Sequence, residues 1–353
     1  MKLMSVVKFF LKLSIAFLLI YWLLKSGKID FSLLLTSTQY KGSWILALFI
    51  YMINIIIVSV RWKVILATKS VKNFSYLSMI QLTWIGGLFN MVLPGAVSGD
   101  FIKLLYVRKI DPELSKTFLL TSVFMDRVLG LFGLLFLMGI ASVINYFELI
   151  ALSPSIKNLV HLNFMIFLMM VLFFLSLFLP ENFQRRVFRL GEKIPFIGKF
   201  FNKTLDQFWS IGKYKKSMVL LVLVSMLTQS MNILTFWILT SPFFEYAPNV
   251  AHTLSLSHAF TFIPLGLVVV AIPITPAGLG VGHVAFSTLF AYYGVTNGAS
   301  LFNNYLMLGA LVNLMGLVPY LMHRKEYTAD AADTADSKAT IRTGNGTAAT
   351  FGA

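Results

Sequence analysis

Two charged residues stand side by side within a stretch long and apolar enough to cross a bilayer. Between Thr117 and Phe147 the only charged side chains are those of Asp126 and Arg127. A charge at a bilayer centre costs about 2.5–3.5 kcal/mol on insertion scales, so residues of this kind usually serve a function. In a functional interpretation, Arg127 binds a lipid phosphate through its planar guanidinium, and Asp126 holds that guanidinium in place. In a structural interpretation, both residues pair with loop charges and fix the helix packing. We favour the functional interpretation.

A loop containing Pro and Gly precedes this pair. It runs from Pro94 to Lys103 and includes Gly95 and Gly99, which allow a tight backbone. A helix is expected to begin near Asp100, where its free N–H groups would suit an anion. Asp100 could instead cap that helix. Lys103, one turn later, would reach the same phosphate.

A second break, from Pro276 to His283, also contains glycines, at Gly278 and Gly280, but carries no charge. The whole segment Tyr246–Met322 has no Asp, Glu, Lys or Arg. An isolated histidine on an apolar helix is more often a packing residue than a ligand. His283 remains a candidate because it directly follows the Gly-rich break.

The composition indicates that these residues lie in a membrane protein. Of the 353 residues, 58% are apolar and only 12% are charged, whereas soluble domains carry roughly 25% charged residues. The chain has no cysteine, which excludes disulfides and thiolate metal sites. The formal charge of +15 lies mainly in short loops between apolar runs, where it reports membrane topology. Nucleic-acid binding is therefore not expected, and neither a metal nor a cofactor is predicted.

The apolar runs predict an all-α, polytopic integral membrane helix bundle of about eight segments. Candidate spans are Val6–Leu24, Ser43–Val60, Thr117–Phe147, Asn158–Leu179, Ser217–Thr240 and Leu301–Met322. The basic loops place the N- and C-termini in the cytoplasm, with the chain in the plasma (inner) membrane.

Two further apolar stretches, Leu77–Leu93 and Ala259–Tyr293, are interrupted or closed by Pro and Gly. The loop charges predict that both flanks of the first are cytoplasmic and both flanks of the second external. Each stretch would then enter the membrane and return, or pair with another short segment. This pattern is typical of inverted repeats with discontinuous helices. Ordinary spans kinked by Pro and Gly are the alternative.

The domain prediction is one transmembrane domain over residues 1–325, with halves of about 1–180 and 181–325. Residues 197–208 repeat apolar side chains at helical spacing. They form either a helix lying in the headgroup layer or a plain cytoplasmic connector. Residues 326–353 are polar, without apolar periodicity, and are predicted to be a disordered cytoplasmic tail.

The charged residues and breaks fall in four blocks that resemble a known family. The blocks are Arg61-Trp62; Asn90-Met-Val-Leu-Pro94-Gly95 leading to Gly99-Asp100; Asp126-Arg127-Val-Leu-Gly130-Leu131; and Pro276-Ala-Gly278-Leu-Gly280-Val-Gly-His283. Over about residues 5 to 325 the chain resembles the flippase-like membrane family that includes the transmembrane region of lysylphosphatidylglycerol synthases. It departs from the family pattern at Lys103, where arginine is usual, and at His283, where glutamate is usual.

The resemblance implies an integral membrane protein, and some members of the family flip aminoacylated phospholipid between leaflets. Other members accompany hopanoid or lipid-linked glycan pathways, so membership of the family does not identify the lipid substrate. The soluble aminoacyl-transferase domain of the full synthases is not found after the last span, so this chain is not expected to synthesise aminoacyl-lipid.

The leading hypothesis is a lipid translocase that binds a phospholipid or lipid-linked headgroup in a cleft between the two breaks. Arg127 and Lys103 would contact the phosphate, with Asp100 and Asp126 orienting them. Gly278 and Gly280 would allow close backbone approach from the opposite side. The full set of candidate substrate-binding residues is Arg61, Asn90, Pro94, Gly95, Gly99, Asp100, Lys103, Asp126, Arg127, Pro276, Gly278, Gly280 and His283.

Two other functions stay open at this stage. One is a membrane enzyme acting on polyprenyl-phosphate or lipid substrates, and the other is an accessory subunit of an envelope-lipid or lipid-linked glycan pathway. The expected partners are a membrane lipid and either a second copy of the chain or a separate lipid synthase. No G-x-x-x-x-G-K-[ST] loop is present, so transport would be passive or ion-coupled.

Overall fold

The computed structural model describes residues 37–92, 98–176, 189, 202, 215–248, 254–272, 275 and 278–322. Within these ranges the regular elements are helices, with one isolated bridge between Tyr246 and Val295. The helices are α3 (Lys41–Leu66), α4 (Tyr76–Val92), α5 (Ser98–Ile110), α6 (Lys116–Ile144), α7 (Tyr146–Leu152), α8 (Pro154–Ser176), α11 (Lys215–Thr240), the short 3₁₀ helix η1 (Ser241–Phe243), α12 (Leu256–Ala271), α13 (Val281–Tyr292) and α14 (Gly298–Leu314).

Five of the described helices are long and apolar enough to cross a membrane: Lys41–Leu66, Lys116–Ile144, Pro154–Phe173, Val219–Phe243 and Gly298–Met322. They correspond to five of the predicted spans, and the prediction of a polytopic helical membrane protein is confirmed. The first predicted span, the amphipathic connector and the tail lie outside the described residues.

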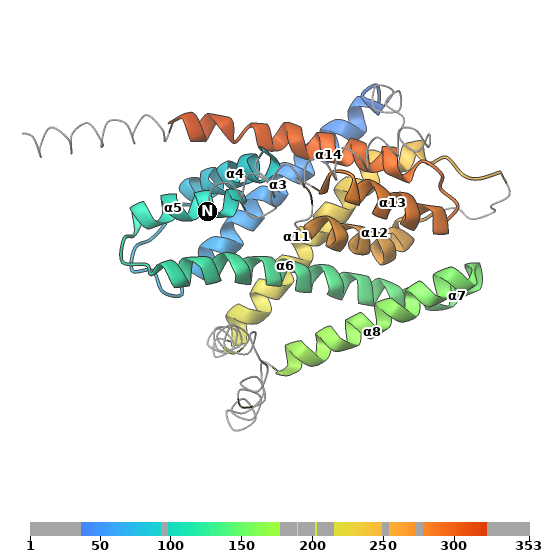
Figure 1. Cartoon of the computed structure of the whole chain (residues 1–353), viewed down its shortest axis with the longest axis horizontal. Coiled ribbons are helices and arrows are strands. Elements are labelled where there is room, and N and C mark those ends of the chain that lie inside the picture. Colours follow the sequence, from blue (N-terminus) through green and yellow to red (C-terminus); the bar gives the residue numbers. More distant parts are fainter. Residues whose placement is uncertain are drawn as a thin grey trace, which may run out of the picture.

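The first broken stretch is a hairpin of two short helices, α4 and α5, which lie side by side (Figure 1). Glycines allow this contact. A Cβ atom on Gly99 would lie only 1.9 Å from the carbonyl oxygen of Gly86. On the other side of α4, a Cβ atom on Gly87 would lie 2.3 Å from the Asn313 side chain, so α14 also packs tightly there. The sequence predicts that Leu77–Leu93 either enters the membrane and returns or pairs with another short segment, and the structure shows the pairing.

The second broken stretch is also a pair of short helices, α12 and α13. Gly278 and Gly280 precede α13 with φ angles of 72° and 77°, a region that side chains with a Cβ rarely adopt. Along the pair, a Cβ atom on Gly266 would lie 2.5 Å from the ring of Phe286. Both stretches are therefore helical hairpins rather than kinked single spans.

The two halves repeat one order of elements: a long helix, a hairpin and a second long helix. The first set is α3, α4–α5 and α6; the second is α11, α12–α13 and α14. Asn54 of α3 donates to Asn232 of α11, and Arg61, later in α3, donates to Ser225, earlier in α11. The two helices are therefore antiparallel.

Each hairpin also packs against the other half, because α4 contacts α14 and α12 contacts α6. The hairpins open at opposite ends of the bundle, and their closed ends point into its interior (Figure 1). This is the arrangement predicted from the two breaks, and it is typical of inverted repeats.

Candidate functional site

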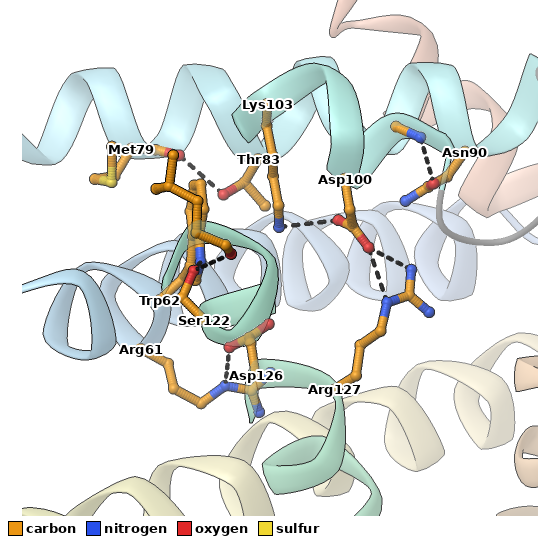
Figure 2. A network of polar contacts seen from close by, with 12 residues as sticks. Arg61, Trp62, Met79, Thr83, Asn90, Asp100, Lys103, Ser122, Asp126 and Arg127 are labelled. Carbon is orange, nitrogen blue, oxygen red and sulfur yellow. Dashed lines mark hydrogen bonds and ion pairs between the residues drawn. The ribbon is translucent and has the colours of Figure 1, made fainter. Parts of the chain in front are cut away.

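Five ionised side chains meet where α3, α5 and α6 come together (Figure 2). We call this set, Arg61, Asp100, Lys103, Asp126 and Arg127, the charged cluster. Four of its members are buried; the exception is Arg127, whose side chain is 35% exposed. Ionic groups are placed in an apolar interior only at a large desolvation cost, which partners must offset.

Asp126 and Arg127 belong to different ion pairs. Arg61 Nε donates to Asp126 Oδ1 at 2.8 Å, and Arg61 Nη1 donates to Ser225 Oγ at 3.0 Å. Arg127 instead donates through Nε to Asp100 Oδ2 at 2.8 Å, and its Nη2 contacts the same oxygen. Successive residues of an α-helix point about 100° apart. The expectation that Asp126 holds the Arg127 guanidinium is therefore wrong.

Asp100 holds two cations at once. Its Oδ1 is 3.0 Å from Lys103 Nζ, while its Oδ2 accepts from Arg127. The helix α5 begins at Ser98, close to the predicted start, and places Asp100 in its first turn. Lys103 Nζ also lies 4.3 Å from the centre of the Trp62 ring, a cation–π contact. Asp100 thus orients both cations that the sequence assigned to a phosphate.

The charged cluster contains three cations and two carboxylates, so it carries one excess positive charge. Arg61 is matched by Asp126, and both of these side chains are buried between α3 and α6. The excess lies on the other pair of cations, Lys103 and Arg127, which share one carboxylate. The arrangement therefore favours the approach of an anion beside Asp100.

Asn90, at the end of α4, ties the hairpin together. Its Oδ1 accepts the backbone N–H of Gly99 at 2.8 Å. This bond joins the end of α4 to the first turn of α5, one residue before Asp100. Pro94 and Gly95, predicted to belong to the same site, lie outside the described residues.

The spacing of Asp126 and Gly130 follows from the helix face that they share. Residues four apart lie one above the other on a helix, and this face of α6 meets α3 and α11. A Cβ atom on Gly130 would lie 3.3 Å from Gln229 Nε2 and 3.7 Å from the Arg61 guanidinium. Glycine therefore leaves room for both side chains.

A chain of neutral hydrogen bonds continues from this point, and the sequence analysis missed it. Gln229 Nε2 donates to the Gly130 carbonyl at 3.1 Å, Asn232 donates to Gln229, and Asn54 donates to Asn232. The signal was available, because Ser225, Gln229 and Asn232 recur at helical spacing in an apolar helix. Such polar residues stabilise contacts between membrane helices.

The second break forms no part of the charged cluster. Gly280 N–H donates to His283 Nδ1 at 3.3 Å, and His283 Nε2 lies 3.2 Å from Asn303 Oδ1. Because Nδ1 accepts, the neutral ring carries its hydrogen on Nε2 and donates to Asn303. Both ring nitrogens are thus used within the protein, and His283 holds the start of α13 against α14. Pro276 lies outside the described residues.

A cavity of about 390 Å³ lies between the closed ends of the two hairpins. Its described lining comes from four helices: Tyr51 of α3; Gly87, Asn90 and Met91 of α4; Leu267, Val270 and Ala271 of α12; and Tyr305, Leu306, Gly309, Ala310 and Asn313 of α14. The predicted cleft between the breaks is present, but neither Lys103 nor Arg127 is among these residues. Asn90 is shared between the cavity and the hairpin that carries Asp100.

Comparison with known proteins agrees with the sequence blocks. The family model described as the lysylphosphatidylglycerol synthase TM region matches residues 9–303. The chain belongs to this family. The matched region of this lysylphosphatidylglycerol synthase TM protein includes the whole charged cluster and both hairpins. The resemblance drawn from the four blocks is therefore confirmed.

A curated relative of this family member is the UPF0104 membrane protein PH1989 of Pyrococcus horikoshii. The two are 25% identical over 314 residues, which cover 80% of this chain and 87% of the relative. No solved structure matches significantly.

Proposed function

We propose that this protein binds the phosphate of a membrane-lipid headgroup beside Asp100, Lys103 and Arg127 and carries the headgroup between leaflets. One observation carries the proposal: two cations share a single carboxylate inside an apolar bundle. A phosphate diester brings the one negative charge that balances this group.

Arg127 is the side chain assigned to the phosphate. Its side chain is 35% exposed, whereas that of Lys103 is 7% exposed and lies over Trp62. The planar guanidinium binds phosphate oxygens in pairs and keeps its charge in an apolar environment. The buried Lys103 adds a second positive charge beside Asp100, and Asp100 positions both cations.

The two hairpins, each of which contacts both halves, support movement rather than binding alone. The hairpins open at opposite ends of the bundle (Figure 1). The C-terminal ends of α4 and α12 line the cavity. In transporters built from inverted repeats, the substrate site lies between discontinuous helices, and the two halves rock around it. The proposal assigns no catalytic step to this chain.

The proposal also includes an orientation in the plasma membrane. Arg108 and Lys109 lie in the last turn of α5, at the open end of the α4–α5 hairpin, and Lys116 is the first residue of the next helix, α6. Positively charged loops stay in the cytoplasm. This end would face the cytoplasm, together with the termini.

The test uses the full chain reconstituted in liposomes that contain phosphatidylglycerol with a fluorophore on one acyl chain. A membrane-impermeant quencher reports how fast label moves from the inner to the outer leaflet. Wild-type protein should accelerate this movement over protein-free vesicles. Arg127→Ala should slow it at least about tenfold, because a hydrogen bond to a charged group contributes about 1.5–3 kcal/mol.

Arg108→Ala is the matched control, because Arg108 is an exposed arginine on α5, the helix that carries Asp100 and Lys103. It should move lipid at the wild-type rate. Wild-type protein that moves no phospholipid faster than empty vesicles, for glycerol, ethanolamine or choline headgroups, would contradict the proposal. Equal slowing by both arginine variants would contradict the assignment of Arg127.

A further inference from the structure

The cavity between the hairpin ends has a mostly apolar lining, and its polar side chains carry no charge. Its described polar side chains are two phenols, Tyr51 and Tyr305, and two carboxamides, Asn90 and Asn313. The remaining described lining is glycine, alanine and aliphatic or thioether side chains. Phenols and amides both donate and accept hydrogen bonds, so the lining suits a neutral group rich in hydroxyls.

The cavity and the charged cluster border the same residue. Asn90 lines the cavity, while its Oδ1 accepts the N–H of Gly99 beside Asp100. Gly86 and Gly87 extend this border along α4: Gly86 packs against Lys103, and Gly87 packs against Asn313. The cavity therefore borders the hairpin that carries Asp100 and Lys103.

We propose that the cavity accepts the part of the headgroup beyond the phosphate, and that this part is an uncharged polyol or sugar. The inference rests on the proposed function. An ammonium group in the cavity would meet no carboxylate among the described lining residues, close to a cluster with one excess positive charge. Burial of an unpaired charge is strongly unfavourable. Hydroxyl groups would instead pair with the amides and phenols, and the tyrosine rings offer flat apolar surfaces.

Small residues keep this space open. A Cβ atom on Gly309 would lie 3.5 Å from Tyr51 Oη. Gly309 and the Tyr51 hydroxyl are therefore neighbours in the cavity lining. A leucine at this position extends beyond its Cβ atom into the cavity. Gly42 gives a matched control, because a Cβ atom there would meet nothing within 4 Å.

The experiment measures lipid binding to the purified full chain in detergent by native mass spectrometry. Phosphatidylglycerol and phosphatidylmethanol with identical acyl chains are compared, since both carry one negative charge and only the first has headgroup hydroxyls. Phosphatidylglycerol should bind about tenfold more tightly, as expected for two hydrogen bonds. Lysylphosphatidylglycerol and phosphatidylethanolamine, which carry ammonium groups, should bind more weakly than phosphatidylglycerol.

Two variants connect this preference to the cavity. Gly309→Leu should reduce the preference to about one, and Tyr51→Phe should reduce it to about threefold by removing one hydroxyl. Gly42→Leu should leave it at the wild-type value. Tyr51→Phe keeps the ring, so it reports on the cavity even if Gly309→Leu fails to fold.

The outcomes separate this inference from the proposed function. Equal binding of phosphatidylglycerol and phosphatidylmethanol, or equally tight binding of lysylphosphatidylglycerol, would overturn the cavity assignment. In that case a loss of both anionic lipids in Arg127→Ala would still support the phosphate site. Binding of every lipid that is unchanged by Arg127→Ala would overturn both.

Discussion

Arg61 and Asp126 form an ion pair of 2.8 Å that joins α3 to α6 across 65 residues of sequence. The neighbouring Arg127 faces the α4–α5 hairpin instead (Figure 2). The charges of Arg61 and Asp126 balance each other, and both side chains are buried. In the second group, two cations, Lys103 and Arg127, share the single carboxylate of Asp100. The first therefore has the features of a packing element and the second those of a binding site.

Removing one member of the Arg61–Asp126 pair should destabilise the fold strongly. Asp126→Leu leaves a buried guanidinium without its carboxylate, at a cost of about 3–5 kcal/mol. Arg61→Met leaves the carboxylate alone, at a similar cost. Thermal unfolding in detergent should show a lower midpoint for each single variant.

The double variant Arg61→Met/Asp126→Leu is the control for this prediction. Two apolar side chains replace a buried ion pair at little net cost, so the midpoint should recover most of the loss. The recovered protein should also still bind anionic lipid at Arg127. A double variant that is stable but unable to bind lipid would show that the Arg61–Asp126 pair takes part in binding.

The antiparallel contact of α3 and α11 can be tested by cross-linking, because the chain contains no native cysteine. Asn54 Nδ2 lies 2.6 Å from Asn232 Oδ1, so Asn54→Cys/Asn232→Cys should react with a short bifunctional thiol reagent. A protease site inserted within residues 181–214 would then leave two fragments that stay joined. Asn54→Cys/Ser225→Cys should remain unlinked, since Ser225 lies about 10 Å further along the helix. Efficient linkage of that second pair would contradict the register.

The types of residue in the site could be predicted from the sequence, but their pairing could not. An Asp-Arg pair within an apolar run is visible because charge is costly in a membrane. The partners depend on which helix faces which, and a single sequence does not contain that information. Asp126 was therefore assigned to Arg127, its chain neighbour, although the two point in different directions from α6.

The hairpins were predictable for a different reason. Loop charge and the Pro and Gly residues in two apolar stretches limit how often the chain can cross, and paired short helices are one of the arrangements that satisfy both. The cavity was not predictable, because Tyr51 and Asn313 look like ordinary residues of spanning helices until α3, α4 and α14 are brought together.

Gly99 should be among the positions least tolerant of substitution. The added carbon of Gly99→Ala would lie 1.9 Å from the Gly86 carbonyl oxygen and 2.7 Å from the Asn90 backbone nitrogen. Backbone atoms cannot move aside as a flexible side chain does, so the hairpin must separate. Overpacking of this kind costs about 1–3 kcal/mol or more, which thermal unfolding in detergent would detect.

Gly42→Ala is the comparison, because nothing lies within 4 Å of the added atom. It should keep the wild-type midpoint, or raise it slightly, because alanine favours helix over glycine. A Gly99→Ala protein as stable as wild type would contradict the close packing of α4 on α5.

His283 should prove to be a residue of the fold rather than a contact for the ligand. His283→Leu removes the acceptor of the Gly280 N–H and the donor to Asn303, and buried groups left unpaired cost about 1–3 kcal/mol. His283→Gln should lose less, because its amide can still donate to Asn303. Neither variant should change the preference between phosphatidylglycerol and phosphatidylmethanol, measured by native mass spectrometry. A His283→Gln protein of normal stability that no longer binds anionic lipid would instead place His283 in the binding site, as its position after the second break first indicated.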